Sequence, residues 1–400
     1  MKQRKIAVVS GTRADYGILF PLLKKIKSKN EFLLQIVAAG MHLSPEFGLT
    51  FEQIEEDGFK IDEKVEMLLS SDTEVSIAKS TGLGMAGFGE AFERLKPDFL
   101  ILLGDRFETL ASAFAAFIAR IPIAHIHGGE VTEGAFDDAI RHSVTKMSQL
   151  HFVSTELYRK RVIQLGEFPN RVFNVGALGI DNIKKMKLLT KSALERVLDF
   201  KFGKNTVLVT FHPVTLEDNT SEKQFTELLK VLSSFKNLKI IFTKPNADTF
   251  GRIILKLIDN YVKKYSYKAK AFTSLGQLNY LSTVKYVDAV IGNSSSGIIE
   301  VPTFGVPTVN IGDRQKGRIR AESIIDCEPS NKTIKLAVKK ALSREFKIRC
   351  GRVQNIYGDG NAAGKIYKIL KKYVGKIKDT KKVFYDLKPD SEIERLSGDN

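Results

Sequence analysis

Polar and charged residues are densest between Ile123 and His142, in the stretch IAHIHGGEVTEGAFDDAIRH. His125 and His127 alternate there with apolar residues, so in a strand both side chains would point to one face. The glycines that follow let a ligand or backbone approach closely. Crowded carboxylates and imidazoles shift one another's pKa values, so the stretch favours acid/base chemistry in a cleft. Its further polar groups are Glu130, Glu133, Asp137, Asp138, Arg141 and His142.

Two other interpretations of this stretch stay open. Its histidines could bind a metal ion, although the chain has no HExxH sequence and no third ligand at a fixed spacing. They could instead be core residues whose ring nitrogens are satisfied by hydrogen bonds, which fits His125 better than His127. We expect acid/base chemistry and no metal ion.

Two loops nearer the N-terminus also follow apolar runs. In SGTRADYG, Gly11 permits a tight turn before a helix whose free N–H groups attract anions, and Arg13 adds a fixed charge for phosphate. A plain turn from strand to helix explains this loop equally well. In LLGDRFE, Asp105 is either a helix N-cap or, beside a ligand-binding Arg106, a group for proton transfer.

The turn NSSSGIIE, from Asn293 to Glu300, offers serine hydroxyls and unpaired N–H groups at a helix start. These groups suit a diphosphate, and Glu300 falls one turn later, where its carboxylate can accept from a ribose diol. A solvated serine loop is the alternative. The anion-binding candidates are Ser294, Ser295 and Gly297, with Arg314, Lys316 and Arg318 as further phosphate-binding charge. Two more strand ends, VTFHP and FTKPNAD, contribute His212 and Asn246.

Short apolar runs alternate with longer amphipathic ones along the whole chain, which predicts βαβ units and parallel sheets. The pattern restarts after a lysine-rich stretch, and 400 residues fit two domains of ordinary size. We therefore expect two facing, doubly wound α/β domains with ligands at the carboxyl ends of the strands. The expected strands are 6–9, 33–39, 99–103 and 121–126, then 207–210, 240–243, 287–291 and 308–311.

Composition excludes several other classes of protein. No apolar run is long enough to span a membrane, and no signal-peptide region follows MKQRK, so we expect a cytoplasmic protein. Cys327 and Cys350 are too few for a disulfide framework or a zinc site, and we expect them to be reduced and structural. The net charge of +16 comes largely from scattered lysines without interleaved aromatic residues, which disfavours nucleic-acid binding.

Six motifs, in this order and spacing, resemble those of the hydrolysing UDP-N-acetylglucosamine 2-epimerases, which supply N-acetylmannosamine for sialic acid synthesis. They are GTRADYG, GDRFE, HIHGGE, DDAIRHSVTKMS, NSSSGIIEVP and NIGDRQKGR, and the likeness runs from about residue 5 to 374. It implies two Rossmann-like domains in a GT-B-like arrangement, with a UDP-sugar in the cleft between them. It also implies homodimers or homotetramers, and a reaction without metal ion or redox cofactor.

The resemblance assigns residues 1–180 to an N-terminal domain with the catalytic loops. Residues 181–374 would form the UDP-binding domain with a closing helix at 361–374, and residues 375–400 a polar tail. In the implied reaction a base removes the proton on carbon 2 while UDP leaves carbon 1, and water then adds to the resulting glycal.

Family roles on the matching positions make Asp105 and Asp137 acid/base groups. Several relatives have HIEGGE, with a catalytic glutamate where this chain has His127; imidazole also shuttles protons near neutral pH, and Glu130 is a nearby candidate to share the work. The implied UDP ligands are Arg13, Arg106, His212, Ser294, Ser295, Gly297, Glu300 and Arg314, with Asn246 a weaker candidate.

Four functional hypotheses follow, and UDP-N-acetylglucosamine is the expected substrate. A close variant would act on UDP-2,4-diacetamido-2,4,6-trideoxyglucose, which requires only a changed pocket around carbons 4 and 6. The third is a non-hydrolysing epimerase, which would release no free UDP. The fold also permits a glycosyltransferase, which would leave carbon 2 unchanged.

Overall fold

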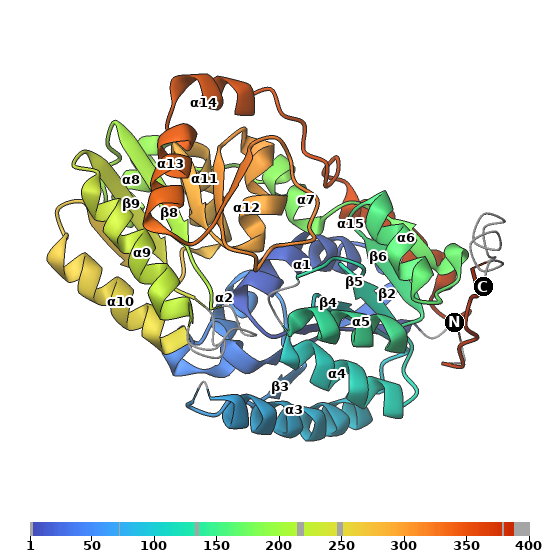
Figure 1. The fold of residues 1–400 in the computed structure, drawn as a ribbon. Helices are drawn as coiled ribbons and strands as arrows, with labels where there is room; N and C mark the ends of the chain where they lie inside the picture. Colours follow the sequence, from blue (N-terminus) through green and yellow to red (C-terminus); the bar gives the residue numbers. More distant parts are fainter. Residues whose placement is uncertain are drawn as a thin grey trace, which may run out of the picture.

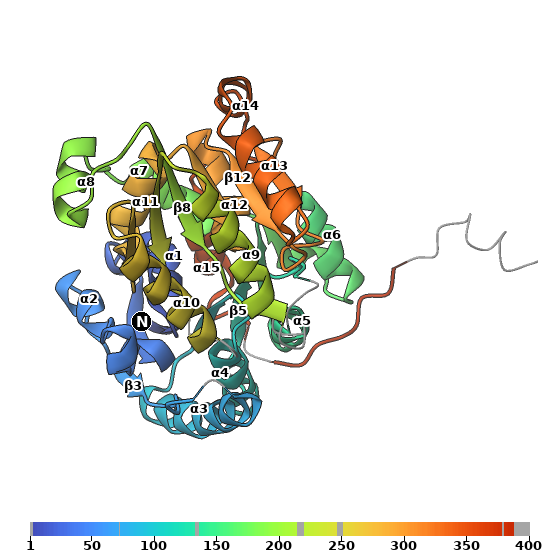
Figure 2. The same ribbon diagram turned by 60° about the vertical axis from the view of Figure 1, so that its left-hand side comes forward.

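The computed structural model describes residues 3–71, 73–132, 136–213, 220–245, 251–377 and 380–387. They form two α/β domains that face each other, as Figures 1 and 2 show from two sides. The expected fold, two facing doubly wound Rossmann-like domains, is confirmed.

In the first domain the described residues form a seven-stranded parallel sheet in the order β3-β2-β1-β4-β5-β6-β7. Strand residues alternate between two cores, since Ile6 and Val8 pack on one face and Ala7 and Val9 on the other. Helices cover both faces, which is why the strands are almost wholly apolar. The strands are β1 (Arg4–Ser10), β2 (Phe32–Ala39), β3 (Glu63–Val65), β4 (Phe99–Leu103), β5 (Ile123–Ile126), β6 (Leu150–Val153) and β7 (Val172–Asn174). The helices are α1 (Arg13–Lys27), α2 (Phe51–Glu56), α3 (Glu74–Leu95), α4 (Phe107–Ile118), α5 (Asp137–Met147), α6 (Glu156–Gln164) and α7 (Leu178–Lys185).

The second domain has, in its described part, a six-stranded parallel sheet in the order β10-β9-β8-β11-β12-β13. Both sheets reverse their strand order beside a central strand, and ligands of such sheets bind at this reversal. The strands are β8 (Asn205–Thr210), β9 (Leu238–Thr243), β10 (Ala269–Phe272), β11 (Ala289–Gly292), β12 (Thr308–Ile311) and β13 (Ile324–Cys327). The helices are α8 (Lys191–Leu198), α9 (Thr220–Ser234), α10 (Gly251–Lys264), α11 (Gly276–Tyr286), α12 (Ser295–Ile299), α13 (Asn331–Ala341) and α14 (Arg344–Cys350).

The closing helix α15 (Ala362–Tyr373) lies on the first domain rather than the second, unlike the predicted division (Figure 1). Its apolar residues Ile366 and Leu370 are buried in the core formed by β1 and α1. Asp181 of α7 caps α15, because its carboxylate accepts from the N–H groups of Ala362 and Ala363 at 2.7 and 3.0 Å. The expected boundary at residue 180 therefore falls inside α7, a helix that belongs to the first domain.

Part of the predicted polar tail packs along the first domain. The backbone N–H of Tyr385 donates to the carbonyl of Gly166 at 2.9 Å. The ammonium of Lys382 lies 2.6 Å from the carboxylate of Glu167, and it donates to the carbonyls of Lys146 and Ser148 at 2.9 and 2.6 Å. The segment 380–387, called the strap below, thus fastens the C-terminal end of α5.

Among the described helices, none combines the length and the apolar character needed to cross a membrane. Within the same residues, no three histidine, cysteine, aspartate or glutamate side chains gather as a metal site would require. Both cysteines are free thiols in the described part of the chain, and burial raises the pKa of Cys327 to about 12 and of Cys350 to about 11.

Candidate active site

A cavity of about 360 Å³ lies between the two domains, where the carboxyl ends of both sheets face each other. Loops after β1, β4 and β5 line one side, and loops after β8 to β12 line the other. The structure brings together most of the residues predicted from the sequence. Those lining the cavity are Arg13, Asp105, Arg106, His127, Glu130, Asp137, His212, Ser294, Ser295, Glu300 and Arg314.

Gly297, a predicted ligand of the diphosphate, lies outside the cavity lining. It is buried in α12, its N–H donates to the carbonyl of Ser294 at 3.1 Å, and its carbonyl accepts from the hydroxyl of Thr308 at 2.8 Å. An added Cβ would lie 2.9 Å from Thr308 Cγ2. Gly297 therefore permits close packing of α12 on β12, and its role as a ligand of the diphosphate stays a prediction. Asn246, the weaker candidate, lies outside the described residues.

His125 and His127 do not share a strand face, contrary to the prediction. Strand β5 ends at Ile126, and His127 has a left-handed backbone with φ of 70°. His125 is buried, with Nε2–H donating to the carbonyl of Gly104 at 2.7 Å and Nδ1 bonded to the hydroxyl of Thr145 at 3.1 Å. Burial lowers its pKa to about 3, so the ring stays neutral. His125 is the core histidine that the alternative interpretation describes.

His127 has a different environment, because it lines the cavity and has one nitrogen engaged. Its Nδ1 lies 3.2 Å from Oε1 of Glu130, while among the described residues Nε2 has no hydrogen-bonding partner. A carboxylate can only accept, so Nδ1 carries a proton, and in the neutral ring Nε2 keeps the lone pair. The geometry thus prepares Nε2 of His127 to accept a proton.

Glu130 is held as a carboxylate by its partners. Burial works to raise the pKa of this side chain, but Arg318 and then His127 and Ser154 outweigh it, and the pKa falls to about 2. The hydroxyl of Ser154 donates to Oε1 at 3.0 Å, and Arg318 donates to Oε2. Arg318 is therefore the partner of a buried carboxylate, and because it also lines the cavity, its role as further phosphate-binding charge stays a prediction.

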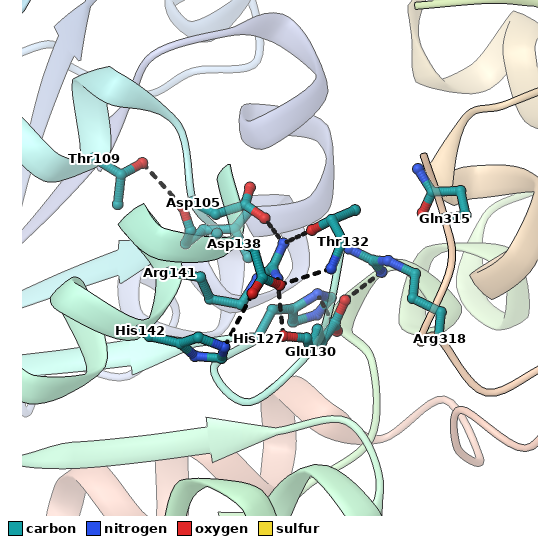
Figure 3. A network of polar contacts seen from close by, with 12 residues as sticks. Asp105, Thr109, His127, Glu130, Thr132, Asp138, Arg141, His142, Gln315 and Arg318 are labelled. Atoms are coloured by element: carbon teal, nitrogen blue, oxygen red, sulfur yellow. Dashed lines mark hydrogen bonds and ion pairs between the residues drawn. The ribbon is translucent and has the colours of Figure 1, made fainter. Parts of the chain in front are cut away.

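Arg141, on α5, is the centre of a second network (Figure 3). Its side chain is fully buried and donates to the carboxylate of Asp105, to Thr132 Oγ1 at 2.6 Å and to the carbonyl of Glu130 at 2.8 Å. It also bonds Asp138 at 3.1 Å. The sequence indicates Arg141 only as one polar residue among several; its helical spacing from Asp138, three residues earlier, is the signal that links them.

The paired aspartates at the start of α5 have separate roles. Asp137 lines the cavity, whereas Asp138 accepts from the backbone N–H of Thr132 at 2.7 Å and lies 3.4 Å from Nε2 of His142. Asp138 thus fixes the loop after β5, and Asp137 remains the candidate for proton transfer.

On the second domain, the carboxylate of Glu300 is set at the end of α12. The hydroxyl of Ser296 donates to it at 2.5 Å, and Tyr280 donates to Ser296 at 2.6 Å. Burial raises the pKa of Glu300, against the effects of Ser296 and His127. Gly179 of the first domain closes over it, because an added Cβ would lie 2.4 Å from Glu300 Oε1.

Three arginine side chains also line the cavity. Arg106 pairs with the buried Glu108 at 3.2 Å, and Arg314 donates to the carbonyl of Asn293 at 3.1 Å. Arg13 lies against Gly276, whose φ of 68° and missing Cβ leave room for the guanidinium. Three arginines from both domains thus border one cavity, which suits a diphosphate.

Fold and site together define a protein of two facing α/β domains whose cleft is lined by arginines and carboxylates. The family described as UDP-N-acetylglucosamine 2-epimerase matches residues 24–371. The chain belongs to this family.

Three relatives and one solved structure are similar over most of their length. The chain is 49% identical to the GDP/UDP-N,N'-diacetylbacillosamine 2-epimerase (hydrolyzing) of Campylobacter jejuni, covering 87% of this chain and 90% of that protein. It is 39% identical to polysialic acid biosynthesis protein P7 of Escherichia coli, covering 96% and 98%. It is 36% identical to the UDP-N,N'-diacetylbacillosamine 2-epimerase (hydrolyzing) of Legionella pneumophila, covering 92% and 96%. The UDP-GlcNAc 2-epimerase of Neisseria meningitidis bound to UDP-GlcNAc has the same fold, with a TM-score of 0.78 at 19% identity, over 92% and 100% of the two chains.

Proposed function

We propose that this chain is a hydrolysing 2-epimerase whose substrate is a UDP-linked 2,4-diacetamido-2,4,6-trideoxyglucose. The observation that carries the proposal is the 49% identity to a hydrolysing diacetylbacillosamine 2-epimerase, supported by the 36% identity to a second one. UDP-N-acetylglucosamine, the substrate expected from the sequence, becomes the second candidate. The 39% identity to a polysialic acid biosynthesis protein favours it.

The side chains around the cavity support such a sugar. Met41, Phe47 and Leu103 line it on the side of the first domain. The 6-methyl group and the methyl group of a second acetamido substituent are apolar where N-acetylglucosamine has hydroxyls, and apolar side chains suit these methyl groups.

In the proposed reaction the nucleotide occupies the second domain. Arg13, Arg106 and Arg314 hold the diphosphate with Ser294 and Ser295, and Glu300 accepts from the ribose. His212 lines the same end of the cavity.

The chemistry takes place on the first domain. Nε2 of His127 removes the proton on carbon 2 while the bond from carbon 1 to the diphosphate oxygen breaks, which leaves a glycal and free UDP. In the second step one of the two aspartates, Asp105 or Asp137, donates a proton to carbon 2 from the opposite face, and the other takes a proton from the water that adds to carbon 1. His127 then releases the abstracted proton to the solvent. The product is the free sugar with the manno configuration.

Measuring the release of the nucleoside diphosphate tests the choice of sugar and of nucleotide. Purified protein is incubated with the diacetamido sugar carried by UDP, the same sugar carried by GDP, and UDP-N-acetylglucosamine. We expect kcat/KM to favour the UDP-diacetamido sugar by about 100-fold over UDP-N-acetylglucosamine, the scale at which a pocket rejects a substrate lacking contacted groups. An equal or higher value with UDP-N-acetylglucosamine would overturn the choice of sugar, and preference for the GDP sugar would overturn the choice of nucleotide.

A further inference from the structure

Glu130 receives its strongest contact from the opposite domain. Its side chain is 2% exposed and lies on the loop after β5, while Arg318, 6% exposed, lies on the loop after β12. Figure 3 shows the Arg318 side chain reaching from the second domain toward Glu130. The same carboxylate bonds Nδ1 of His127 through its other oxygen, at 3.2 Å. One buried carboxylate therefore joins an arginine of one domain to the candidate base of the other.

The charge of Glu130 decides which nitrogen of His127 holds the proton. As a carboxylate it accepts from Nδ1–H, which leaves Nε2 as a base. Without a cation nearby, a buried carboxyl group takes up a proton, because burial disfavours its charged form. A neutral carboxylic acid can donate to Nδ1, and the ring proton then moves to Nε2. The imidazole would in that state have no lone pair toward the cavity.

Arg318 shares its loop with the candidate grip on the nucleotide. Arg314 and Gln315 both donate to the carbonyl of Asn293, at 3.1 and 3.0 Å, and Asn293 precedes the serines at the start of α12. Arg318 lies four residues beyond Arg314 on the same chain segment. The loop thus connects the nucleotide end of the cavity to the pair of Glu130 and His127.

We propose that Arg318 is a positioning residue: by pairing with Glu130 it holds His127 in the tautomer that accepts the carbon 2 proton, and only when the two domains are closed. This inference rests on the proposed function. It makes the base available when the nucleotide-binding domain is in place, which restricts proton abstraction to the closed cleft.

Other ionisable groups face Glu130 and His127, and none of them is changed in the variants proposed below. Arg141 donates to the carbonyl of Glu130, and Arg161 donates to the carbonyl of Gly129 at 2.8 Å. The phenols of Tyr158 and Tyr357 lie near Arg318 and are bonded to each other at 3.2 Å, while Glu300 faces His127 from the second domain.

Arg318→Gln tests the proposal through kinetics. We expect kcat to fall by about 100-fold or more, the scale of losing a positioned base, while KM and the UDP dissociation constant change less than about threefold. The acid limb of the kcat profile should move to higher pH, because Glu130 loses the cation that keeps its pKa low. Arg318→Lys should restore part of kcat. A loss of UDP affinity with unchanged kcat would make Arg318 a phosphate ligand and overturn the proposal.

Further variants test whether a loss of kcat reflects misfolding, and whether Arg318 acts through Glu130. Arg344→Gln changes an exposed arginine of α14 in the same domain, away from the cavity lining, and it should leave kcat unchanged. If Arg318→Gln does not fold, the double variant with Glu130→Gln removes both charges at once, and Arg318→Lys keeps the charge. Because Arg318 acts through Glu130, the double variant should have the kcat of Glu130→Gln alone. A lower kcat in the double variant than in Glu130→Gln would contradict the action of Arg318 through Glu130.

A substrate-free readout separates this proposal from the proposed function. Nitrogen NMR of the histidine rings, assigned with His127→Gln, should find Nδ1 of His127 protonated and Nε2 unprotonated in the wild type. The pattern should reverse or average in Arg318→Gln. If the wild type turns over no UDP-sugar but the ring nitrogens behave as stated, the function is wrong and the positioning role stands. An unchanged His127 pattern in Arg318→Gln would overturn the positioning role.

Discussion

At the residue scale, the site depends on buried cations that hold carboxylates in fixed positions. Arg141 and Arg318 are both almost fully buried, and each engages a carboxylate that lines the cavity, Asp105 and Glu130 respectively. A buried ion pair adds little net stability, but it orients its members. The two arginines therefore serve the geometry of the site more than its stability.

Asp105→Asn should keep the fold and lose turnover. The amide oxygen can still accept from Arg141, but the amide cannot exchange a proton with the substrate. We expect kcat to fall by about 100-fold to 10,000-fold, as for other acid/base groups. Steady-state kinetics measure this, and an unchanged melting temperature serves as the control. Normal turnover by the folded variant would remove Asp105 from the catalytic groups.

Gly179→Ala should weaken nucleotide binding without unfolding the protein. The new methyl group would meet the flexible end of Glu300 at 2.4 Å, so the carboxylate moves while the backbone stays. Losing one hydrogen bond to the ribose corresponds to about 1.4 kcal/mol, a tenfold weaker UDP affinity by calorimetry. Gly89→Ala, where an added Cβ meets nothing within 4 Å, is the matched control. Equal UDP affinity in both variants would argue against Glu300 as a ligand.

The sequence predicted which residue types line the cavity, but it did not predict which side chains pair with one another. The cavity contains Asp105, His127 and Asp137 as expected, because each follows an apolar strand and such loops meet at one edge of a sheet. The alternation of His125 and His127 was misleading, because β5 ends one residue before His127. The pairing of Glu130 with Arg318 spans 188 residues, and only the arrangement of the two domains determines it.

At the element scale, the buried central strands were predictable and the edges were not. Long apolar runs such as β1 and β8 appear at the expected positions. The three-residue edge strand β3, Glu63–Val65, carries two charged residues and has no apolar run to indicate it. The sequence of α15 predicts an amphipathic helix, but its pattern does not state which core receives the apolar face.

The strap should stabilise α5, the helix that presents Asp137 and Arg141. Lys382 compensates the last carbonyls of α5 and pairs with Glu167, while burial lowers its own pKa to about 8. Lys382→Ala should lower the free energy of unfolding by about 1 to 3 kcal/mol in urea titrations. Lys335→Ala, on an exposed face of α13, is the control. Equal stability of both variants would mean that the strap contributes nothing to α5.

At the scale of the whole molecule, two domains form one site only through contacts across the cleft. The carbonyl of Gly17 in α1 accepts from Asn182 and Gln277, both at 2.7 Å, so α11 of the second domain is tied to the first. The tyrosine pair Tyr158 and Tyr357 adds a buried contact beside Arg318. The family resemblance predicted two facing domains and a cleft, but not these contacts, because they depend on how loops far apart in sequence meet.

As the pH falls, the protein should begin to lose stability at pH values well above the pKa of ordinary carboxylates. Burial lowers the pKa of His42 to about 4 and of His125 to about 3, from 6.5. Below pH 6.5 the unfolded chain therefore binds protons that the folded chain does not, and stability falls toward pH 4 by about 1.4 kcal/mol per pH unit for each histidine. Glu130 and Glu167, with pKa values of about 2, extend the loss below pH 4.5. Urea titrations at pH 7 and pH 5 measure this, and equal stability at both would contradict it.

Proton NMR of the reaction in deuterated water tests the proposed function most directly. The substrate is the UDP-linked 2,4-diacetamido-2,4,6-trideoxyglucose, and the spectrum reports the sugar product, the released nucleotide and the proton on carbon 2 together. We predict free UDP and a free manno-configured sugar that carries deuterium at carbon 2. A UDP-linked manno product without free UDP, or a product that keeps its original proton on carbon 2, would contradict the hydrolysing epimerase proposed for this cleft.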